Sequence, residues 1–351
     1  MGPKAWLTRG TARLRRFSRT YTTRKIQDWP EPVVVSNPLI SIVMCCHNRR
    51  HLLEPTMEAI FAQKYRPVEI VVLDDGSTDG TDELMAGYGD RVRYFRQEAR
   101  GSAAARNAAC REARGDLIAF QDDDDLMLPD RIVKLFDALQ RYPAAIFATG
   151  DYEIIDTEGN RTGHRWRPLS GDALGEPRLI EDAYAEVMWP NIPAVPQTTL
   201  FRKSAAERIG WLDTDFRYSA SDKDFYARLA RLGPIVYVPE VMCYIRRGHA
   251  SIWDNKFRAL YGKIQLLEKH LSLIGHGEKR IRDRLQTQML HTLRQVASYK
   301  NEGARLDDPQ VEEFFQRGLS LLKPLDRISF HLYKTIKLPI RKALQRAIAI
   351  H

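Results

Sequence analysis

The sequence predicts an α/β fold, in which helices flank a sheet of mainly parallel strands, followed by an α-helical appendage. Short apolar runs rich in Val and Ile alternate with helical patterns up to about residue 250 of the 351 residues. Two of these runs end in clusters of aspartates, and beyond residue 253 only helical periodicity remains. The chain is long enough for one domain of about 200 to 250 residues and a substantial appendage.

The expected elements follow from the hydrophobic pattern and from its interruption by Gly, Pro and Asp. A linker with three prolines, Trp29 to Pro38, precedes the first strand. The small side chains from Ala103 to Ala109 permit a helix to pack closely on the sheet. Strands are expected at residues 39–46, 68–73, 92–95, 117–120, 146–152 and 235–238, and helices at 52–63, 82–86, 103–109, 130–141, 180–188 and 225–232.

The second expected strand, Val68 to Leu73, ends in the pair Asp74 and Asp75. Gly76 lets the backbone turn sharply after this pair, and the following Ser, Thr and Asp side chains can cap a helix. Ligands of open α/β sheets bind beyond the carboxyl ends of the strands. The pair is therefore a candidate binding site, although a plain connection from strand to helix explains the same residues.

The run Asp122 to Asp125 follows the apolar strand Leu117 to Phe120 and is the strongest single signal. Four like charges at a strand end repel one another unless they are fully hydrated or hold a cation. Hard carboxylate oxygens favour Mg²⁺ or Mn²⁺ over softer metals. Two neighbouring strands that end in carboxylates indicate one shared site, whereas a solvated acidic turn is the plain alternative for this run alone.

Four segments carry a more specific signal, namely Ser41 to Arg49, Val71 to Thr81, Ala103 to Asn107 and Gly115 to Asp125. In this order and spacing they resemble the family 2 inverting glycosyltransferases, and the resemblance covers about residues 38 to 250. It implies a GT-A type, Rossmann-like mixed sheet flanked by helices. It also implies that a sugar moves from a nucleotide-diphosphate sugar, with UDP as the expected nucleotide, to an acceptor hydroxyl.

The resemblance implies which residues bind the donor. The family usually has Pro-Thr-Tyr-Asn at the end of its first strand, where Thr and Tyr touch the nucleotide base, and this chain has Cys45-Cys46-His47-Asn48. An imidazole can still stack on a pyrimidine, so His47 keeps a candidate role. The residues expected to bind the donor are Cys46, His47, Asn48, Arg49, Asp74, Asp75, Arg106, Asp122 and Asp123.

The resemblance also implies a metal site. Asp122 and Asp124 stand at the outer positions of the family's Asp-x-Asp motif, which holds Mn²⁺ or Mg²⁺ against the donor diphosphate. His249 lies near a histidine of the family that can join the metal, although the alignment is offset by some residues there. The expected metal ligands are therefore Asp122, Asp124 and His249.

An inverting transfer needs one base that takes the proton of the acceptor hydroxyl as its oxygen attacks. The family's Glu-Asp motif falls at Ser221 and Asp222, so the glutamate is replaced and the aspartate is kept. Asp222 is the expected base, and Asp224 is the alternative. Both residues would also stabilise a helix N-terminus without any catalytic role.

The formal net charge of +9 is concentrated at the two ends of the chain. Residues 1–36 and 323–351 each carry a net charge of +6, so the part between them is slightly acidic. A nucleic-acid-binding domain would place its positive charge on the folded core, so no nucleic-acid partner is expected. Basic ends fit an anionic membrane surface instead, where each Lys or Arg contributes about 1 kcal/mol.

The absence of long apolar runs and the pattern of the cysteines indicate where the protein is expected to act. The sequence has no apolar run of 18 residues and no recognisable secretory leader, and its four cysteines, two of them adjacent, form no CxxC pair. We expect a cytoplasmic protein with reduced thiols, and peripheral attachment to the inner face of the membrane stays open.

Four parts of the chain are expected: a basic N-terminal extension (1–37), the catalytic domain (38–252), a helical appendage (253–322) and a basic amphipathic C-terminal segment (323–351).

The predicted function is metal-dependent, inverting transfer of a sugar to a hydroxyl of a glycan or lipid-linked acceptor, as in surface polysaccharide or cell-envelope glycan synthesis. Acceptor recognition is expected in the proline-rich stretch 161–196. A nucleotidyltransferase or a dehydrogenase would need a glycine-rich loop after the first strand, and Cys45 to Arg50 contains no glycine. A catalytically inactive sugar-nucleotide-binding or membrane-associated scaffold protein stays open because of Ser221.

Overall fold

The computed structural model describes residues 37–166, 175–189, 191–216, 219–248, 256–275, 277–301 and 310–337. All of them belong to one unit that begins at Ser36. His249, the basic N-terminal extension and residues 338–351 lie outside the described residues.

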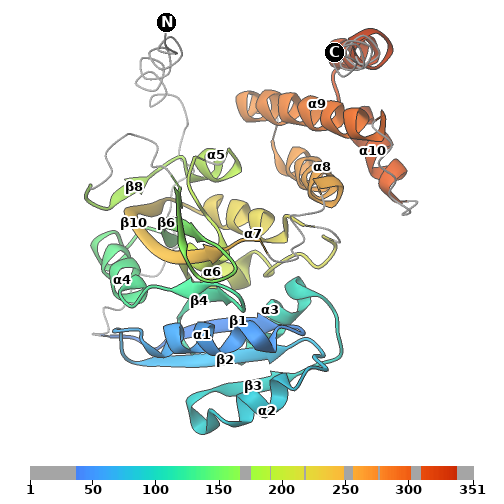
Figure 1. The fold of residues 1–351 in the computed structure, drawn as a ribbon. Coiled ribbons are helices and arrows are strands. Elements are labelled where there is room, and N and C mark those ends of the chain that lie inside the picture. The colour runs from blue at the N-terminus through green and yellow to red at the C-terminus, as the bar shows by residue number, and fades with distance from the viewer. Residues whose placement is uncertain are drawn as a thin grey trace, which may run out of the picture. The chain divides into compact units, whose positions relative to one another are not determined.

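A ten-stranded mixed sheet forms the centre of the structure (Figure 1). Strands β1 to β4 are parallel, β9 runs antiparallel to β4 and β6, and β10 runs parallel to β6. β7 extends the sheet beside β6, and β8 pairs with β10. The order along the main path is β3 (Arg93–Arg96), β2 (Val68–Asp74), β1 (Ile40–Cys46), β4 (Leu117–Asp122), β9 (Thr199–Arg202), β6 (Phe147–Ile155), β10 (Ile235–Arg246) and β5 (Leu126–Met127), with β7 at Arg161–Arg165 and β8 at Arg178–Ile180.

Helices cover both faces of this sheet, as the alternating pattern predicts. On one face, α1 and α4 bury their apolar sides against β1, β2 and β10 in a core that includes Met57 and Leu135. On the other face, Phe120 of β4 and Phe201 of β9 pack against Phe225 of α7, with ring centroids 5.0 to 5.8 Å apart. The helices of this part are α1 (Arg50–Phe61), α2 (Thr81–Ala86), α3 (Ser102–Glu112), α4 (Arg131–Arg141), α5 (Ala183–Met188), α6 (Lys203–Arg208) and α7 (Ser221–Ala230), with 3₁₀ turns at Gly89–Arg91 and Pro196–Thr198.

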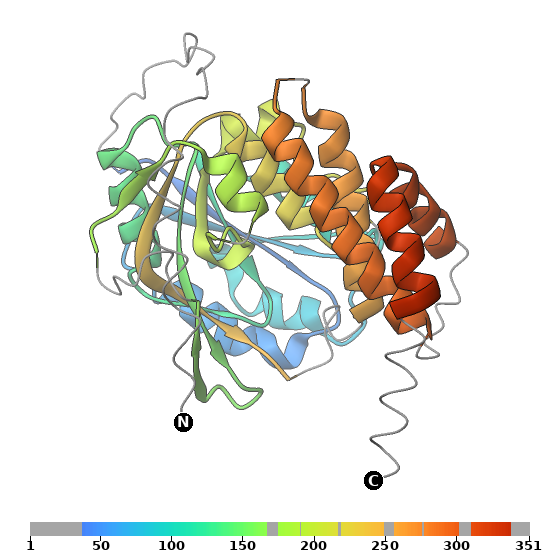
Figure 2. The same cartoon turned by 90° about the horizontal axis from the view of Figure 1, so that it is seen from above.

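The predicted C-terminal helical part is present. Helix α8 (Lys256–Leu273) packs against α9 (Lys279–Asn301) and against α7, and α10 (Gln310–Ser320) packs against α8 and α9 (Figure 2). Helix α11 (Pro324–Leu332) follows and continues into a π-helical turn, Tyr333–Lys337. Within the described residues, the structure contains no helix with the length and apolar composition that a membrane span requires.

Strands β5, β8 and β9 and helix α6 were not predicted, and further differences concern β10, α7 and β7. β10 continues for twelve residues instead of ending near Val238, because two shifts of register between Val238 and Cys243 accommodate Pro239 within the strand. α7 begins at Ser221 rather than at Phe225, so Asp222 lies in its first turn. Residues 161–165 form β7 of a hairpin with β6, so the stretch expected to be loop-rich begins with a strand.

Gly115 fixes the approach of β4 to β1. Its backbone N–H donates to Ser41 Oγ over 2.9 Å. A Cβ atom at this position would lie 2.5 Å from the carbonyl oxygen of Leu39 and 2.9 Å from the backbone nitrogen of Ser41. Because both atoms belong to the backbone at the start of β1 or directly before it, they cannot move without displacing the strand.

We expect Gly115→Ala to lower the free energy of unfolding by about 2 to 4 kcal/mol, because the added methyl forces β1 and β4 apart. Gly277→Ala is the matched control, since no atom of the described residues lies within 4 Å of a Cβ there. The control should change stability by less than about 0.5 kcal/mol. Urea unfolding measures both, and equal midpoints would contradict this view of the β1–β4 contact.

Candidate active site at the carboxyl ends of the parallel strands

The pairing register of β1, β2 and β4 places the acidic strand ends side by side at one edge of the sheet. β1 pairs in parallel with β2 on one side and with β4 on the other. Cys46 lies opposite Asp74 of β2, and Cys45 lies opposite Asp122 of β4. The candidate donor and metal residues therefore start from three adjacent strands at the same edge of the sheet.

The turns after β1 and β2 are bonded to each other. Asn48 has a positive φ of 52°, and its side-chain oxygen accepts a hydrogen bond of 2.7 Å from the backbone N–H of Thr78. The N–H of Asn48 donates to Ser77 Oγ over 3.0 Å, and His47 Nδ1 lies 2.8 Å from the carbonyl oxygen of Asp75. These bonds fix the loop that begins at His47, and the imidazole itself is exposed.

Asp74 and Asp75 have different surroundings although they are neighbours. Asp74 is fully buried and accepts hydrogen bonds from the N–H of Ser77 and the hydroxyl of Tyr94. The carboxylate of Asp75 accepts from the backbone N–H groups of Arg100 and Gly101, at 2.9 and 2.7 Å. Asp74 therefore holds the turn, whereas Asp75 joins this turn to the loop that precedes α3.

The two adjacent cysteines point to opposite sides of β1, as side chains alternate along a strand. Cys46 is buried in the core beneath α1, with its sulfur 4.0 Å from the carbonyl oxygen of Leu73. The Cys45 thiol lies on the side of Arg106 and Asp122, and burial raises its pKa to about 12. The backbone of Cys46 is at the strand end, and its side chain lies on the face of β1 opposite to that of Cys45, Arg106 and Asp122.

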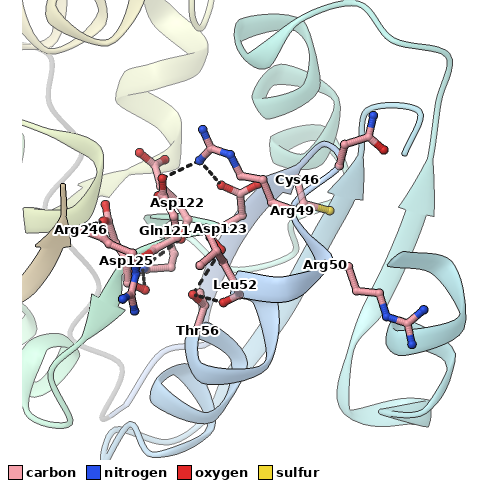
Figure 3. A network of polar contacts seen from close by, with 12 residues as sticks. Cys46, Arg49, Arg50, Leu52, Thr56, Gln121, Asp122, Asp123, Asp125 and Arg246 are labelled. Atoms are coloured by element: carbon pink, nitrogen blue, oxygen red, sulfur yellow. Dashed lines mark hydrogen bonds and ion pairs between the residues drawn. The ribbon is translucent and has the colours of Figure 1, made fainter. Parts of the chain in front are cut away.

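A compact group of carboxylates follows β4. One carboxylate oxygen each from Asp122, Asp124 and Asp125 lies within 4.8 Å of the others. Arg49 reaches this group from the end of β1, and its Nη1 lies 3.0 Å from Asp123 and 2.5 Å from Asp124 (Figure 3). Figure 3 also shows Thr56 of α1 bonded to the carbonyl oxygen of Asp123, which ties the acidic loop to α1.

Burial and mutual repulsion make this group electrostatically unfavourable without a cation. Burial, with the charges of Asp124 and Asp222, raises the pKa of Asp122 in spite of Arg106. Burial raises the pKa of Asp123 to about 7 and the pKa of Asp125 well above its ordinary value. Three convergent carboxylates are a ligand set that a divalent cation fits, because its charge would offset this repulsion.

Two residues outside the expected donor and metal sets complete the acidic group. Gln197, in the 3₁₀ turn before β9, donates to Asp122 and also to Asp125, the latter over 2.6 Å. The backbone N–H of Arg246 donates to the other oxygen of Asp125 over 2.8 Å, and the guanidinium of Arg246 bonds the carbonyl oxygens of Asp124 and Thr157. The only feature of the sequence that indicated Asp125 was its place as the last of four consecutive aspartates.

Arg106 lies on α3 beneath the acidic group. Its guanidinium pairs with Asp122 at 2.5 Å and lies 5.9 Å from the centre of the Phe120 ring. Burial disfavours its charged form, but Asp122 outweighs this effect and the pKa of Arg106 is raised. Arg106 therefore stays charged and neutralises one carboxylate of the group.

Asp222 lies in the first turn of α7, across from the end of β4. Its carboxylate accepts a hydrogen bond of 2.8 Å from the N–H of Lys223. Its charge contributes to the raised pKa values of both Asp122 and Arg106, so its side chain is close to these groups. His249, the third expected metal ligand, lies outside the described residues.

Asp224, the alternative base, lies on the opposite side of α7 and is fully buried. Its carboxylate contacts Arg228 at 2.7 Å, Lys269 at 2.9 Å and His270 at 3.2 Å. Burial alone would raise its pKa, but these partners outweigh burial and the pKa of Asp224 is lowered. Asp224 thus joins α7 to α8 and is remote from solvent.

Sequence comparisons identify relatives of this chain. A family model described as Glycosyl transferase family 2 matches residues 41–210. An uncharacterised glycosyltransferase of Haemophilus influenzae is 34% identical over 227 residues, which cover 63% of this chain and 84% of that protein. The uncharacterised glycosyltransferase RC0461 of Rickettsia conorii is 31% identical over 144 residues, which cover 40% of this chain and only 23% of that protein's own length.

Two solved structures share the fold. TarS 1–349 of S. aureus in complex with UDP-GlcNAc has a TM-score of 0.57 at 14% identity, over 86% of this chain and 88% of that chain. The mannosyltransferase PcManGT from Pyrobaculum calidifontis in complex with GDP-Man and Mn²⁺ has a TM-score of 0.52 at 18% identity, over 93% and 84%. Since residues 1–252 make up less than 86% of the chain, the shared fold extends into the C-terminal helices.

We expect Asp224→Asn to lower the free energy of unfolding by about 3 to 5 kcal/mol, because Lys269 and Arg228 lose a buried counterion. Asp213→Asn is the matched control, since Asp213 contacts the same Lys269 nitrogen at 2.6 Å but is partly exposed. Its loss should cost at most about 1 kcal/mol. Equal effects of the two variants in urea unfolding would show that Asp224 does not hold α7 to α8.

The buried His270 predicts a pH dependence of stability. Burial lowers its pKa below the ordinary value of 6.5, so the unfolded chain binds the proton more tightly than the folded protein. Stability should be full above about pH 7.5 and should fall as the pH drops through 6.5 towards the lower folded pKa. In urea unfolding, His270→Gln should reduce this slope, whereas the exposed His164→Gln should keep it; equal slopes in the two variants would contradict the expectation.

Proposed function

Because this chain belongs to the family 2 glycosyltransferases, we propose that it transfers a sugar from a nucleotide-diphosphate sugar to an acceptor hydroxyl with inversion, using a divalent cation. The observation that carries this proposal is the position of Asp222. It lies across from the acidic group at the end of β4, close enough to affect the charges of Asp122 and Arg106. This position supports a proposal in which the base and the cation face one space at the ligand-binding edge of the sheet.

Asp122, Asp124 and Asp125 would hold the cation, and Mn²⁺ or Mg²⁺ suits their hard oxygens. When bound, the cation supplies positive charge against the nucleoside diphosphate that leaves. Gln197 and the N–H of Arg246 orient Asp125, so the 3₁₀ turn before β9 and the end of β10 fix this proposed ligand. His249 stays a proposed additional ligand.

Asp222 would act as the general base. It accepts the proton of the acceptor hydroxyl while the hydroxyl oxygen bonds to the anomeric carbon. The bond from that carbon to the diphosphate oxygen breaks with both electrons on the diphosphate, so charge is balanced and the configuration inverts. The proton on Asp222 then passes to solvent. Its place in the first turn of α7 keeps this carboxylate fixed relative to β4.

The donor would bind along the ends of β1 and β2. The exposed His47, in the turn after β1, would contact the nucleoside. Asp75, after β2, is proposed to contact it as well, although Asp75 is buried and its carboxylate already accepts hydrogen bonds from the loop before α3. Arg49 and Arg106 bring positive charge to the side where the diphosphate would lie. UDP is the proposed nucleotide, and a glycan or lipid-linked acceptor of the cell envelope is the proposed acceptor.

We also propose that the basic C-terminal segment binds an anionic membrane surface. In α11, Leu325 is 79% and Ile328 is 57% exposed, which is unusual for large apolar side chains. Lys323 precedes Leu325, and Arg327 lies between Leu325 and Ile328 in the sequence. Apolar side chains that insert between lipids, beside basic groups, are typical of helices that lie on membrane surfaces.

The test combines donor binding with transfer. Calorimetry with UDP and Mn²⁺ should show binding to the parent and to Asp222→Asn, and should show little or none to Asp124→Asn, because the metal site is damaged. Transfer or donor hydrolysis in Asp222→Asn should fall about 10²- to 10⁴-fold, since the base is lost while the donor still binds.

Asp90→Asn is the matched control, because Asp90 is an exposed aspartate in the 3₁₀ turn Gly89–Arg91. It should keep the binding and turnover of the parent. Full turnover in Asp222→Asn would remove the proposed base, and metal-independent binding in both Asp124→Asn and the parent would remove the proposed cation.

A further inference from the structure

Arg49 reaches the acidic group through a single nitrogen atom. Its Nη1 lies 3.0 Å from a carboxylate oxygen of Asp123 and 2.5 Å from one of Asp124. In the part of the chain that the structure describes, the other guanidinium nitrogens of Arg49 make no hydrogen bond or ion pair. The side chain of Arg49 is 30% exposed, so part of it faces solvent although it bridges two carboxylates.

The backbone on both sides of this contact is fixed. Asn48, which precedes Arg49, is bonded to the turn after β2 through its N–H and its side-chain oxygen. Helix α1, which begins directly after Arg49, also holds the acidic loop, because the hydroxyl of Thr56 bonds the carbonyl oxygen of Asp123. A change in the contacts of Arg49 therefore needs only rotation of its side chain.

The two arginines of the acidic group are held differently. The side chain of Arg106 is only 13% exposed, and it pairs with Asp122 and lies beside the ring of Phe120. A largely buried arginine that loses its carboxylate becomes an uncompensated buried charge, whereas a partly exposed arginine can be hydrated while it changes partners. Arg49 is therefore the arginine of this group that can exchange one partner for another.

The carboxylate that Arg49 holds most closely belongs to the proposed metal site. Asp124 is one of the three convergent carboxylates, and the other two, Asp122 and Asp125, are both bonded to Gln197. A guanidinium and a divalent cation on the same carboxylate repel each other, because both are positively charged. The contact of Arg49 with Asp124 therefore opposes binding of a cation at this site.

Arg49 also connects the two ends of the proposed donor site. Its backbone follows the turn of His47 and Asn48, where the nucleoside would bind, and its guanidinium lies on Asp124. A diphosphate that joins a nucleoside at this turn to a cation at the acidic group would pass the guanidinium of Arg49. Arginine binds phosphate oxygens through strong charge-assisted hydrogen bonds. The donor thus offers Arg49 a second partner within reach of the first.

We propose that Arg49 exchanges partners during donor binding: it holds Asp124 before the cation binds, and it turns to the donor diphosphate when the cation takes Asp124. The inference rests on the proposed function, because it concerns the cation and the donor of the same site. Through this exchange, each of the two ligands strengthens the binding of the other, and such coupling is equal in both directions.

The first measurement is binding of Mn²⁺ alone to the full chain, followed by electron paramagnetic resonance of the free ion. A pH of about 8 limits competition between protons and the metal. Arg49→Gln should bind Mn²⁺ about tenfold more tightly than the parent, because the opposing positive charge is lost. Arg49→Lys keeps the charge and should bind Mn²⁺ about as the parent does.

Arg50→Gln is the matched control. Arg50 is the next residue of the chain, but its guanidinium pairs with Glu83 at 3.2 Å and points away from the acidic group (Figure 3). This variant loses the same charge and should keep the Mn²⁺ and UDP affinities of the parent.

The second measurement is calorimetric titration with UDP at saturating Mn²⁺. Arg49→Gln should bind UDP about tenfold less tightly than the parent, because the diphosphate loses the guanidinium. The two affinities of this variant thus change in opposite directions. A merely structural role of Arg49 would weaken both, because the strand ends that carry the site would be displaced.

Urea unfolding in EDTA checks that each variant is folded, and Arg49→Met, which keeps most of the apolar stem without the charge, repeats both measurements. Mn²⁺ affinity in the Gln and Met variants that is equal to or below that of the parent would overturn the exchange. Unchanged UDP affinity at saturating Mn²⁺ would overturn it as well. Either result, with normal Mn²⁺ and UDP binding by the parent, would reject this inference alone. Absence of Mn²⁺ binding in the parent would reject the cation of the proposed function, and the exchange with it.

Discussion

Electrostatic repulsion among the carboxylates that follow β4 is the constraint on which the arrangement of the site depends. Aspartates this close together and this deeply buried cannot all be charged unless positive or hydrogen-donating groups surround them. The fold supplies these from distant parts of the chain: Arg49 after β1, Arg106 on α3 and Gln197 before β9. Each of these groups neutralises only part of the acidic group, and the proposed cation would neutralise the rest.

Helix α7 links this charged edge to the C-terminal helices. Asp222 and Asp224 are two residues apart, so they lie on different sides of the helix and have different tasks. Asp222 faces the end of β4, while Asp224 is buried against Lys269 and His270 of α8. The helical part is therefore more than an appendage in structural terms, because it fixes the helix that carries the proposed base.

The features that sequence reasoning predicted depend on local patterns. The strands that end at Asp74 and Asp122 are marked by apolar runs that stop at carboxylates, and the structure places these ends at one level. The start of α7 was predicted four residues late, because Ser, Asp and Asp among residues 221–224 have low intrinsic helix propensity. The two aspartates favour a helix at its N-terminus, and the buried contacts of Asp224 with α8 also favour helix there. The position of Asp125 depends on a backbone donor 121 residues away, for which a single sequence contains no signal. The roles of the site residues stay predictions.

All four cysteines of the chain are at least half-buried, and burial raises the pKa of each thiol. Since the thiolate is the form that reacts with electrophiles and oxidants, these side chains should be nearly inert near neutral pH. A cysteine introduced at an exposed position would then be the reactive one. Site-selective attachment of a fluorophore or spin label to this protein therefore does not require prior removal of its native thiols.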